Sequence, residues 1–224
     1  MRRDEIYALG YPADEAYGPC IEFVSEYADP GDEILDLGGG EGAYSYELNR
    51  RGFKCINADL NKKYLSKSRA RGVESCAMDA RFLGFKDKSF DVVLLFEVIE
   101  HIPHYDEVLE EAYRVARKHI LITVPNCSDY RKLKEQRLTY DHFLGTDHVN
   151  FFAKEDLEAL LSKHFNNFRV KEGEPIVFKA DPALIISPLL RRTICFLMRQ
   201  NLTGPKVRFG LGVNYRLYGI VDVV

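Results

Sequence analysis

The chain has 224 residues, of which 46% are hydrophobic and 29% are charged, and its formal net charge at pH 7 is −3. This length and composition exclude a disordered chain and fit a protein with its own hydrophobic core. The weak negative charge excludes a basic coat of the kind that binds nucleic acid over the whole surface. Five widely spaced cysteines form no C-x-x-C pair, which favours reduced thiols in a cytoplasmic protein over a disulfide framework. No run of about 18 apolar residues occurs, so we expect no membrane span.

Hydrophobic patterning then predicts strands and helices in alternation. A short helix through Ile21 and Tyr27 ends at the turn Pro30-Gly31. Strands are expected at residues 33–37, 53–58, 73–78, 90–96 and 119–124, with helices at 44–51, 62–71 and 105–116 between them. Alternation at this spacing implies parallel β-α-β units with right-handed crossovers.

The alternation breaks after Pro125. A later helix is expected at about 154–163, and two last strands near 167–178 and 212–223. Two intervening segments, 126–152 and 181–208, lack a clear period, and the second holds an apolar stretch that we interpret as a lid or packing element. We therefore expect one α/β domain over residues 1–224 with a loop-rich cap made from these two segments.

The strongest local signal is the sequence D-L-G-G-G-E-G at residues 36–42, directly after a strand and before a helix. Glycines there allow a sharp turn and the close approach of a ligand. Gly38, Gly40 and Ala43 also satisfy the dinucleotide pattern G-x-G-x-x-G/A, so an NAD-dependent oxidoreductase is one alternative. The carboxylate of Asp36 argues against a pyrophosphate ligand, which it would repel, and suits an amine-bearing one.

Residues 34–44 resemble the first motif of class I S-adenosylmethionine-dependent methyltransferases. The resemblance implies a Rossmann-like fold, in which a mostly parallel seven-stranded sheet carries helices on both faces. It implies S-adenosylmethionine as the cofactor, with the loop under its methionine part and ribose. The loop residues so assigned to cofactor binding are Asp36, Gly38, Gly39, Gly40 and Gly42.

Further acidic residues extend this resemblance, which covers roughly residues 20–165. Asp59, followed by Leu60, matches the residue that binds the ribose hydroxyls in the family, and Asp79, followed by Ala80, matches the one that meets the adenine amino group. Phe96 falls where a residue often packs on the cofactor. The implied function is methyl transfer to an oxygen or nitrogen of a small-molecule acceptor, and a non-catalytic binding module is an alternative of another class.

The sequence E-V-I-E-H at residues 97–101 carries a second signal. On a helix, Glu97, Glu100 and His101 would converge, and such ligands suit Mg²⁺, Mn²⁺ or Fe²⁺. The pattern resembles the metal site of ubiquinone-pathway O-methyltransferases and of small-RNA 2′-O-methyltransferases, in which a later histidine, here His148, completes the site. Pro103 can end the helix at once, and similar residues occur in methyltransferases without a metal. We therefore assign no metal ligands and keep a divalent ion as an alternative.

In-line methyl transfer depends mainly on positioning and on exclusion of water, and a hydroxyl acceptor also needs a base or a metal. His148, His142, Glu100 and His101 are the catalytic candidates.

A basic run at residues 131–137 indicates an anionic substrate or a solvated helix face. A metal-assisted RNA 2′-O-methyltransferase or a glycan methyltransferase is therefore an alternative, although the net acidic chain makes a nucleic-acid partner a minority interpretation. An apolar lid would instead admit a hydrophobic acceptor.

Overall fold

The computed structural model describes residues 15–128, 148–179 and 210–223. Packing divides the chain into two compact units, residues 1–173 with 216–224 and residues 174–215. Every side chain of the candidate site lies in the first unit, and the fold is described for that unit. The expectation of one domain over residues 1–224 stays a prediction. Most of the expected cap segment 126–152 and all of 181–208 lie outside the described residues.

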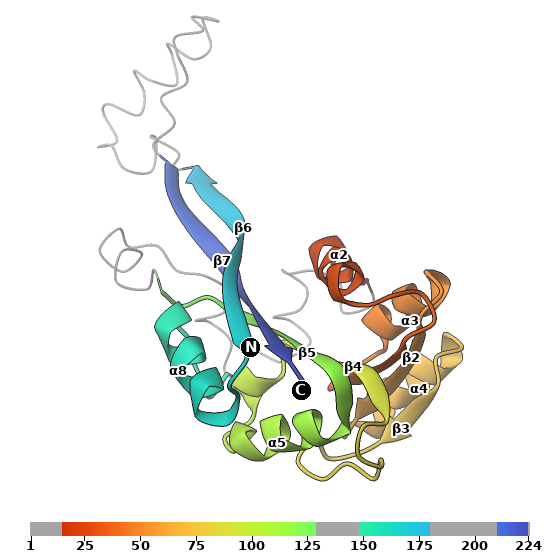
Figure 1. Ribbon diagram of the computed structural model, residues 1–224. Helices are drawn as coiled ribbons and strands as arrows, with labels where there is room; N and C mark the ends of the chain where they lie inside the picture. Colours follow the sequence, from red (N-terminus) through yellow and green to blue (C-terminus); the bar gives the residue numbers. More distant parts are fainter. Residues whose placement is uncertain (1–14, 129–147, 180–209, 224) are drawn as a thin grey trace, which may run out of the picture. The chain divides into compact units, whose positions relative to one another are not determined.

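Seven strands form one sheet in the order β3-β2-β1-β4-β5-β7-β6 (Figure 1). Their bounds are β1 Glu33–Leu37, β2 Lys54–Asp59, β3 Ser75–Ala77, β4 Phe90–Phe96, β5 Ala116–Pro125, β6 Phe168–Lys179 and β7 Gly210–Asp222. The pairs β1–β2, β1–β4, β2–β3 and β4–β5 are parallel, and β7 runs antiparallel to β5. The mostly parallel seven-stranded sheet expected from the sequence is confirmed.

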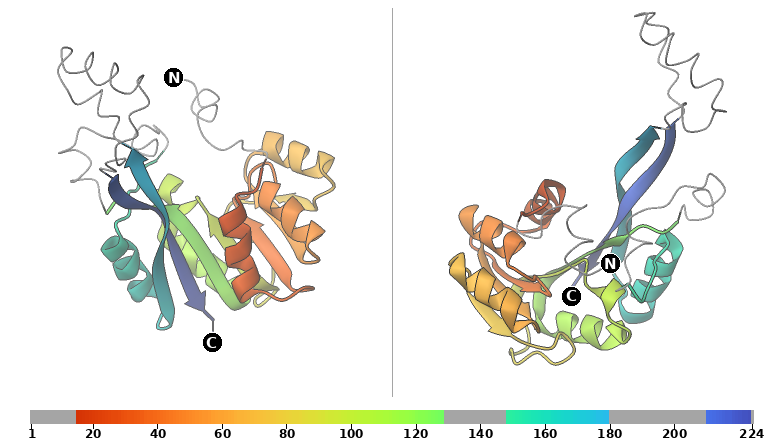
Figure 2. Two further views of the ribbon diagram at one scale, coloured as in Figure 1. Left: turned by 90° about the horizontal axis from the view of Figure 1, so that it is seen from above. Right: turned by 180° about the vertical axis from the view of Figure 1, so that it is seen from behind.

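Helices cover both faces of this sheet, as Figures 1 and 2 show. Their bounds are α2 Gly18–Tyr27, α3 Ala43–Arg50, α4 Lys62–Ala70, α5 Tyr105–Val115 and α8 Lys154–His164, and η2 Ile99–His101 is a single 3-10 turn. α2 and α3 pack in one hydrophobic core, and α5 and α8 pack in the other. Among the described residues, no helix is long and apolar enough to cross a membrane.

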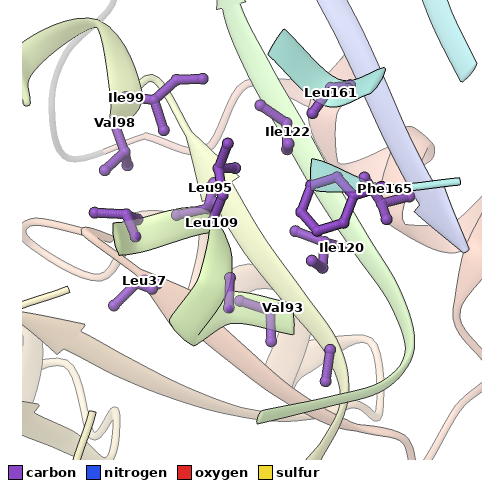
Figure 3. Close-up of a cluster of buried hydrophobic side chains, with 14 of the residues drawn as sticks. Leu37, Val93, Leu95, Val98, Ile99, Leu109, Ile120, Ile122, Leu161 and Phe165 are labelled. Carbon is purple, nitrogen blue, oxygen red and sulfur yellow. The ribbon is translucent and has the colours of Figure 1, made fainter. Parts of the chain in front are cut away.

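Strand β4 explains why two cores form. Its side chains alternate between the faces, so that Val93 and Leu95 join the core under α5 and α8, and Val92 and Leu94 join the core under α2 and α3. Figure 3 shows the first core, with Leu109 of α5 against the sheet. A strand buried on both faces has a nearly continuous apolar sequence, which is the pattern of F-D-V-V-L-L-F.

The strand expected at residues 119–124 is longer in the structure, Ala116–Pro125, and most other bounds shift by one or two residues. Two further differences lie near the candidate site. The third strand is only Ser75–Ala77 instead of 73–78, because the chain turns back at once and an isolated antiparallel bridge joins Asp79 to Phe82. The helix that would align residues 97–101 is wrong. Glu97 has a φ of +54°, and only the turn Ile99–His101 is helical, ending before Pro103, since a residue that precedes proline avoids the helical region.

Candidate functional site

The glycine loop adopts a backbone that L side chains rarely take. Gly38, Gly40 and Gly42 have φ values of +80°, +53° and +73°. A side chain at Gly38 would have its Cβ 2.7 Å from Cγ2 of Val98, and one at Gly42 would meet the Ser68 hydroxyl group. At Gly40, by contrast, a Cβ would have no neighbour within 4 Å. The loop is therefore tightly packed at Gly38 and Gly42. It is open at Gly40, where a ligand can approach the backbone.

Asp59 lies beside this open glycine. Its Oδ2 accepts a hydrogen bond from the Gly40 N–H at 3.0 Å, and its Oδ1 accepts one from the Asn61 N–H at 2.6 Å. The two groups meet because β1 and β2 are parallel neighbours whose carboxyl ends lie at the same edge of the sheet. A partly exposed carboxylate next to an open loop can also accept hydrogen bonds from the hydroxyl groups of a ligand.

Asn57 stabilises the glycine loop through hydrogen bonds, and sequence patterns did not predict this role. It is fully buried in β2, and its Nδ2 donates to the Gly40 carbonyl oxygen and to Ser68 Oγ, both at 2.9 Å. A polar side chain inside an otherwise apolar strand was the available signal, because buried amides are retained where they have hydrogen-bond partners.

Asp36 points into the protein instead of outward. Only 1% of it is exposed, and its Oδ2 accepts a hydrogen bond from Ser45 Oγ at 2.7 Å. Burial raises the pKa of this carboxyl to about 6, against a smaller lowering by the Ser45 hydrogen bonds. A Cβ at Gly39 would collide with this carboxyl group. Asp36 thus fills the space beneath the loop, and a direct contact between it and a ligand amine stays a prediction.

Asp79 follows β3 and is held by an arginine. Arg81 donates from Nε to Oδ1 at 3.0 Å and from Nη2 to Oδ2 at 2.6 Å, which lowers the pKa of Asp79 to about 2. Leu60, which follows Asp59, is 70% exposed, and Ala80 is partly exposed. The ends of β2 and β3 thus present an ionised carboxylate and an apolar side chain to solvent.

Phe96, the last residue of β4, is 6% exposed. Its ring stands edge-on to Tyr44 with centroids 5.3 Å apart and stacks on Phe23 at 6.2 Å. It therefore belongs to the core under α2 and α3, and its contact with a cofactor stays a prediction.

Glu97, directly after β4, pairs with a buried arginine. Arg216 of β7 is 6% exposed, and its Nε donates to Glu97 Oε1 at 2.9 Å. The Arg216 guanidinium also lies 5.0 Å from the centre of the Tyr17 ring. Antiparallel β7 makes this pair possible, because its register sets Arg216 opposite Pro125 at the carboxyl end of β5. The expected convergence of Glu97 with Glu100 and His101 is wrong, since the positive φ at Glu97 directs its carboxylate to β7 instead.

Glu100, His101 and His148 do come together. They offer potential ligand atoms that lie within 4.8 Å of one another, and the two imidazole rings are 4.7 Å apart. Glu100 is 1% exposed, and the histidines are partly exposed. One carboxylate with two imidazoles fits the donor set that divalent transition metals accept. His142 lies outside the described residues, as does the basic run at 131–137.

Backbone hydrogen bonds hold His148 in this cluster. The N–H groups of Val149 and Asn150 donate to the Glu100 carbonyl oxygen at 2.9 and 3.0 Å. The Asn150 side chain donates to the carbonyl oxygens of Ile99 and Ile102 at 2.9 and 2.8 Å. This anchoring fixes the histidine against η2 although the two are far apart in sequence.

Residues 11–171 match the model of a methyltransferase domain family. The chain belongs to that family. This methyltransferase domain has the parallel β1–β2 edge, glycine loop and acidic strand end described above, in agreement with the resemblance found in the sequence. The match favours a methyltransferase over the NAD-dependent oxidoreductase that the loop pattern alone allowed.

Known proteins similar to this methyltransferase domain include two quinone-pathway enzymes. A demethylmenaquinone methyltransferase from a Mycobacterium species is 39% identical over 88 residues, which are 39% of this chain and 38% of that protein. A ubiquinone biosynthesis O-methyltransferase from Hahella chejuensis is 34% identical over 105 residues, 43% of this chain and 44% of that protein. The chain thus matches only about two fifths of the length of these relatives.

The fold resemblance extends further than the sequence similarity. A crystal structure of a SAM-dependent methyltransferase from Archaeoglobus fulgidus superposes with a TM-score of 0.65 at 19% identity and covers 91% of each chain. At this identity the likeness shows the fold alone.

Proposed function

We propose that this protein is an S-adenosylmethionine-dependent methyltransferase that acts on an oxygen or nitrogen of a small-molecule acceptor. The observation that carries the proposal is the hydrogen bond between the Gly40 N–H and Asp59 Oδ2, which sets an open glycine backbone beside an acidic strand end. The glycine loop would support the methionine part and ribose, Asp59 would accept hydrogen bonds from the ribose hydroxyl groups, and Leu60 and Asp79 would meet the base.

Isothermal titration with S-adenosylhomocysteine tests this cofactor site. We expect a dissociation constant well below about 1 mM, which corresponds to about 4 kcal/mol of binding free energy. NAD⁺ serves as the comparison ligand and should not bind. Preference for NAD⁺ over S-adenosylhomocysteine would contradict the proposal.

For the acceptor we propose an apolar molecule with an ionisable hydroxyl or amine group. Next to His148, the side chains of Val149 and Phe151 are 52% and 48% exposed and offer an apolar surface. Relatives whose names refer to demethylmenaquinone and to ubiquinone biosynthesis support a quinol-like acceptor. A methyl-transfer assay with labelled S-adenosylmethionine and short-chain quinols, amines, glycans and RNA would decide between the acceptor classes, and the quinols should be labelled.

His148 is the proposed general base of this reaction. It is anchored next to His101 and the buried Glu100, and a neutral imidazole can accept a hydroxyl proton as the methyl group transfers. His148→Gln should lower the rate of methyl transfer about 100- to 10,000-fold. The affinity for S-adenosylhomocysteine should stay unchanged, which the same titration checks. Equal rates for the variant and the parent protein would contradict this role, and His142 would then be the next candidate for the general base.

A divalent ion held by Glu100, His101 and His148 is the second candidate mechanism, because the donor set fits. Such an ion would orient the acceptor oxygen and lower its pKa. Mn²⁺ titrated into the chelator-treated protein should then bind to the parent protein and fail to bind to His101→Ala. Methyl transfer that is unchanged after exhaustive chelation would remove this candidate. We also propose a cytoplasmic location, supported by Cys55, Cys76 and Cys127, which form no disulfide within the described part of the chain.

A further inference from the structure

Arg81, which follows β3, binds the carboxylate of Asp79, the group proposed to contact the base of the cofactor. Its backbone N–H and its Nε both donate to Asp79 Oδ1 at 3.0 Å, and its Nη2 donates to Asp79 Oδ2 at 2.6 Å. A carboxylate has about four lone-pair directions. Arg81 therefore occupies three of them and leaves one direction, on Oδ2, for a further donor.

The turn that carries Arg81 is closed on its other side. The Phe82 N–H donates to the Asp79 carbonyl oxygen at 3.0 Å, and the Arg81 guanidinium lies 5.8 Å from the centre of the Phe82 ring. A bidentate guanidinium pair within such a short turn restricts the rotation of the carboxylate. The free lone pair on Oδ2 thus has a fixed direction.

The neighbouring strand end supplies a surface for a flat ring. The Met78 N–H donates to the Asp59 carbonyl oxygen at 3.2 Å, which ties the chain leading to Asp79 to the end of β2. Leu60 follows Asp59 and is 70% exposed. The residues Leu60 and Asp79 therefore follow two strand ends that a backbone hydrogen bond joins.

We propose that Arg81 is a positioning residue that makes Asp79 a fixed hydrogen-bond acceptor, so that the site selects a 6-amino purine over a 6-oxo purine. This inference rests on the proposed cofactor site. An ionised carboxylate can only accept hydrogen bonds. It binds the amino group of adenine and repels the carbonyl oxygen of hypoxanthine. Without the Arg81 side chain, only the backbone N–H of residue 81 holds Oδ1, so the carboxylate can rotate away from the base and the preference weakens.

Equilibrium binding of S-adenosylhomocysteine and S-inosylhomocysteine to the full chain tests this role. In the parent protein the adenine compound should bind about 10- to 100-fold more tightly, the value of one hydrogen bond to a charged group. Arg81→Ala should lose most of this ratio through weaker binding of the adenine compound. Arg81→Lys, which can still hold one carboxylate oxygen, should retain part of it.

Two further variants complete the experiment. Asp79→Asn should abolish the preference, because an amide can accept from an amino group or donate to a carbonyl oxygen. Arg169→Ala removes another exposed arginine–aspartate pair, with Asp222 at 3.2 Å, and should keep the parental ratio. The inference is overturned if Arg81→Ala keeps the parental ratio or if the parent protein shows no preference. In both cases tight binding of S-adenosylhomocysteine would leave the proposed function intact, whereas absence of binding would remove both.

Discussion

The buried carboxyl group of Asp36 makes the free energy of unfolding depend on pH. Burial raises its pKa from 3.8 to about 6, so the folded chain binds a proton more tightly than the unfolded chain. Its contribution to stability is therefore complete below about pH 4 and is lost as the pH rises through about 6. The loss amounts to about 3 kcal/mol.

Asp36→Asn should remove this loss, because an amide group does not ionise, and its oxygen can still accept the Ser45 hydrogen bond. We expect the free energy of unfolding of the variant, relative to the parent protein, to rise by about 2 kcal/mol between pH 4 and pH 7. Urea denaturation at several pH values measures it. Asp29→Asn, at an exposed position, is the control, and an equal rise in both variants would contradict the role of burial.

A second prediction for a single residue concerns Asp59. Asp59→Ala should weaken the binding of S-adenosylhomocysteine by about 1–3 kcal/mol, since the proposed ribose hydrogen bonds and the Gly40 contact are both lost. Asp59→Asn should lose less, because one amide oxygen still accepts. Titration calorimetry compares the three proteins, and an unchanged affinity for Asp59→Ala would mean that the ribose binds elsewhere.

Among the structural elements, the glycine loop offers a test that separates packing from ligand access. Gly40→Val has room for its Cβ but a φ of +53°, so the folded variant should lose about 1–3 kcal/mol of stability and all measurable cofactor binding. Gly39→Ala would instead press on the buried Asp36 carboxyl group, and its loss of stability should be the larger. Thermal unfolding and titration calorimetry distinguish them. Normal cofactor binding by Gly40→Val would contradict the assignment of the loop.

Elements buried on both faces were the ones that the sequence predicted best. The strands at residues 33–37 and 90–96 agree with the structure at both ends, because mainly apolar runs and flanking turn residues define them. Convergence of the side chains at residues 97–101 was considered on the condition of a helix there, since side-chain spacing alone does not reveal a positive φ at Glu97. The partner of Glu97 is Arg216, more than a hundred residues later, and local spacing cannot predict such a pair.

Part of the candidate site was predictable because local sequence patterns define it. The positions of Gly40 and Asp59 follow from parallel strands that end at one edge, so local patterns were sufficient. By contrast, Asn57 and Arg81 act through hydrogen bonds to other side chains and backbone groups, and no spacing rule predicts such partners. Asp36 was correctly placed at the end of the strand, but its inward direction depends on packing against α3.

For the whole molecule, the two cores on opposite faces of the sheet set the stability. Leu109 of α5 is fully buried against the sheet (Figure 3). Leu109→Ala should lower the free energy of unfolding by about 2–5 kcal/mol through the cavity that it leaves. Urea denaturation measures this change, and Leu60→Ala, at an exposed position, should cost little stability. A small loss for Leu109→Ala would mean that α5 relaxes to refill the core.

Val98 lies between the two halves of the proposed reaction site. Its side chain packs under Gly38 of the cofactor loop, and two residues later the chain reaches Glu100 and then His101. Replacements around His148 should therefore change the acceptor that binds, while the proposed cofactor loop keeps its conformation. A bulkier side chain at position 98 would disturb both halves at once, so natural or engineered diversification should spare this valine.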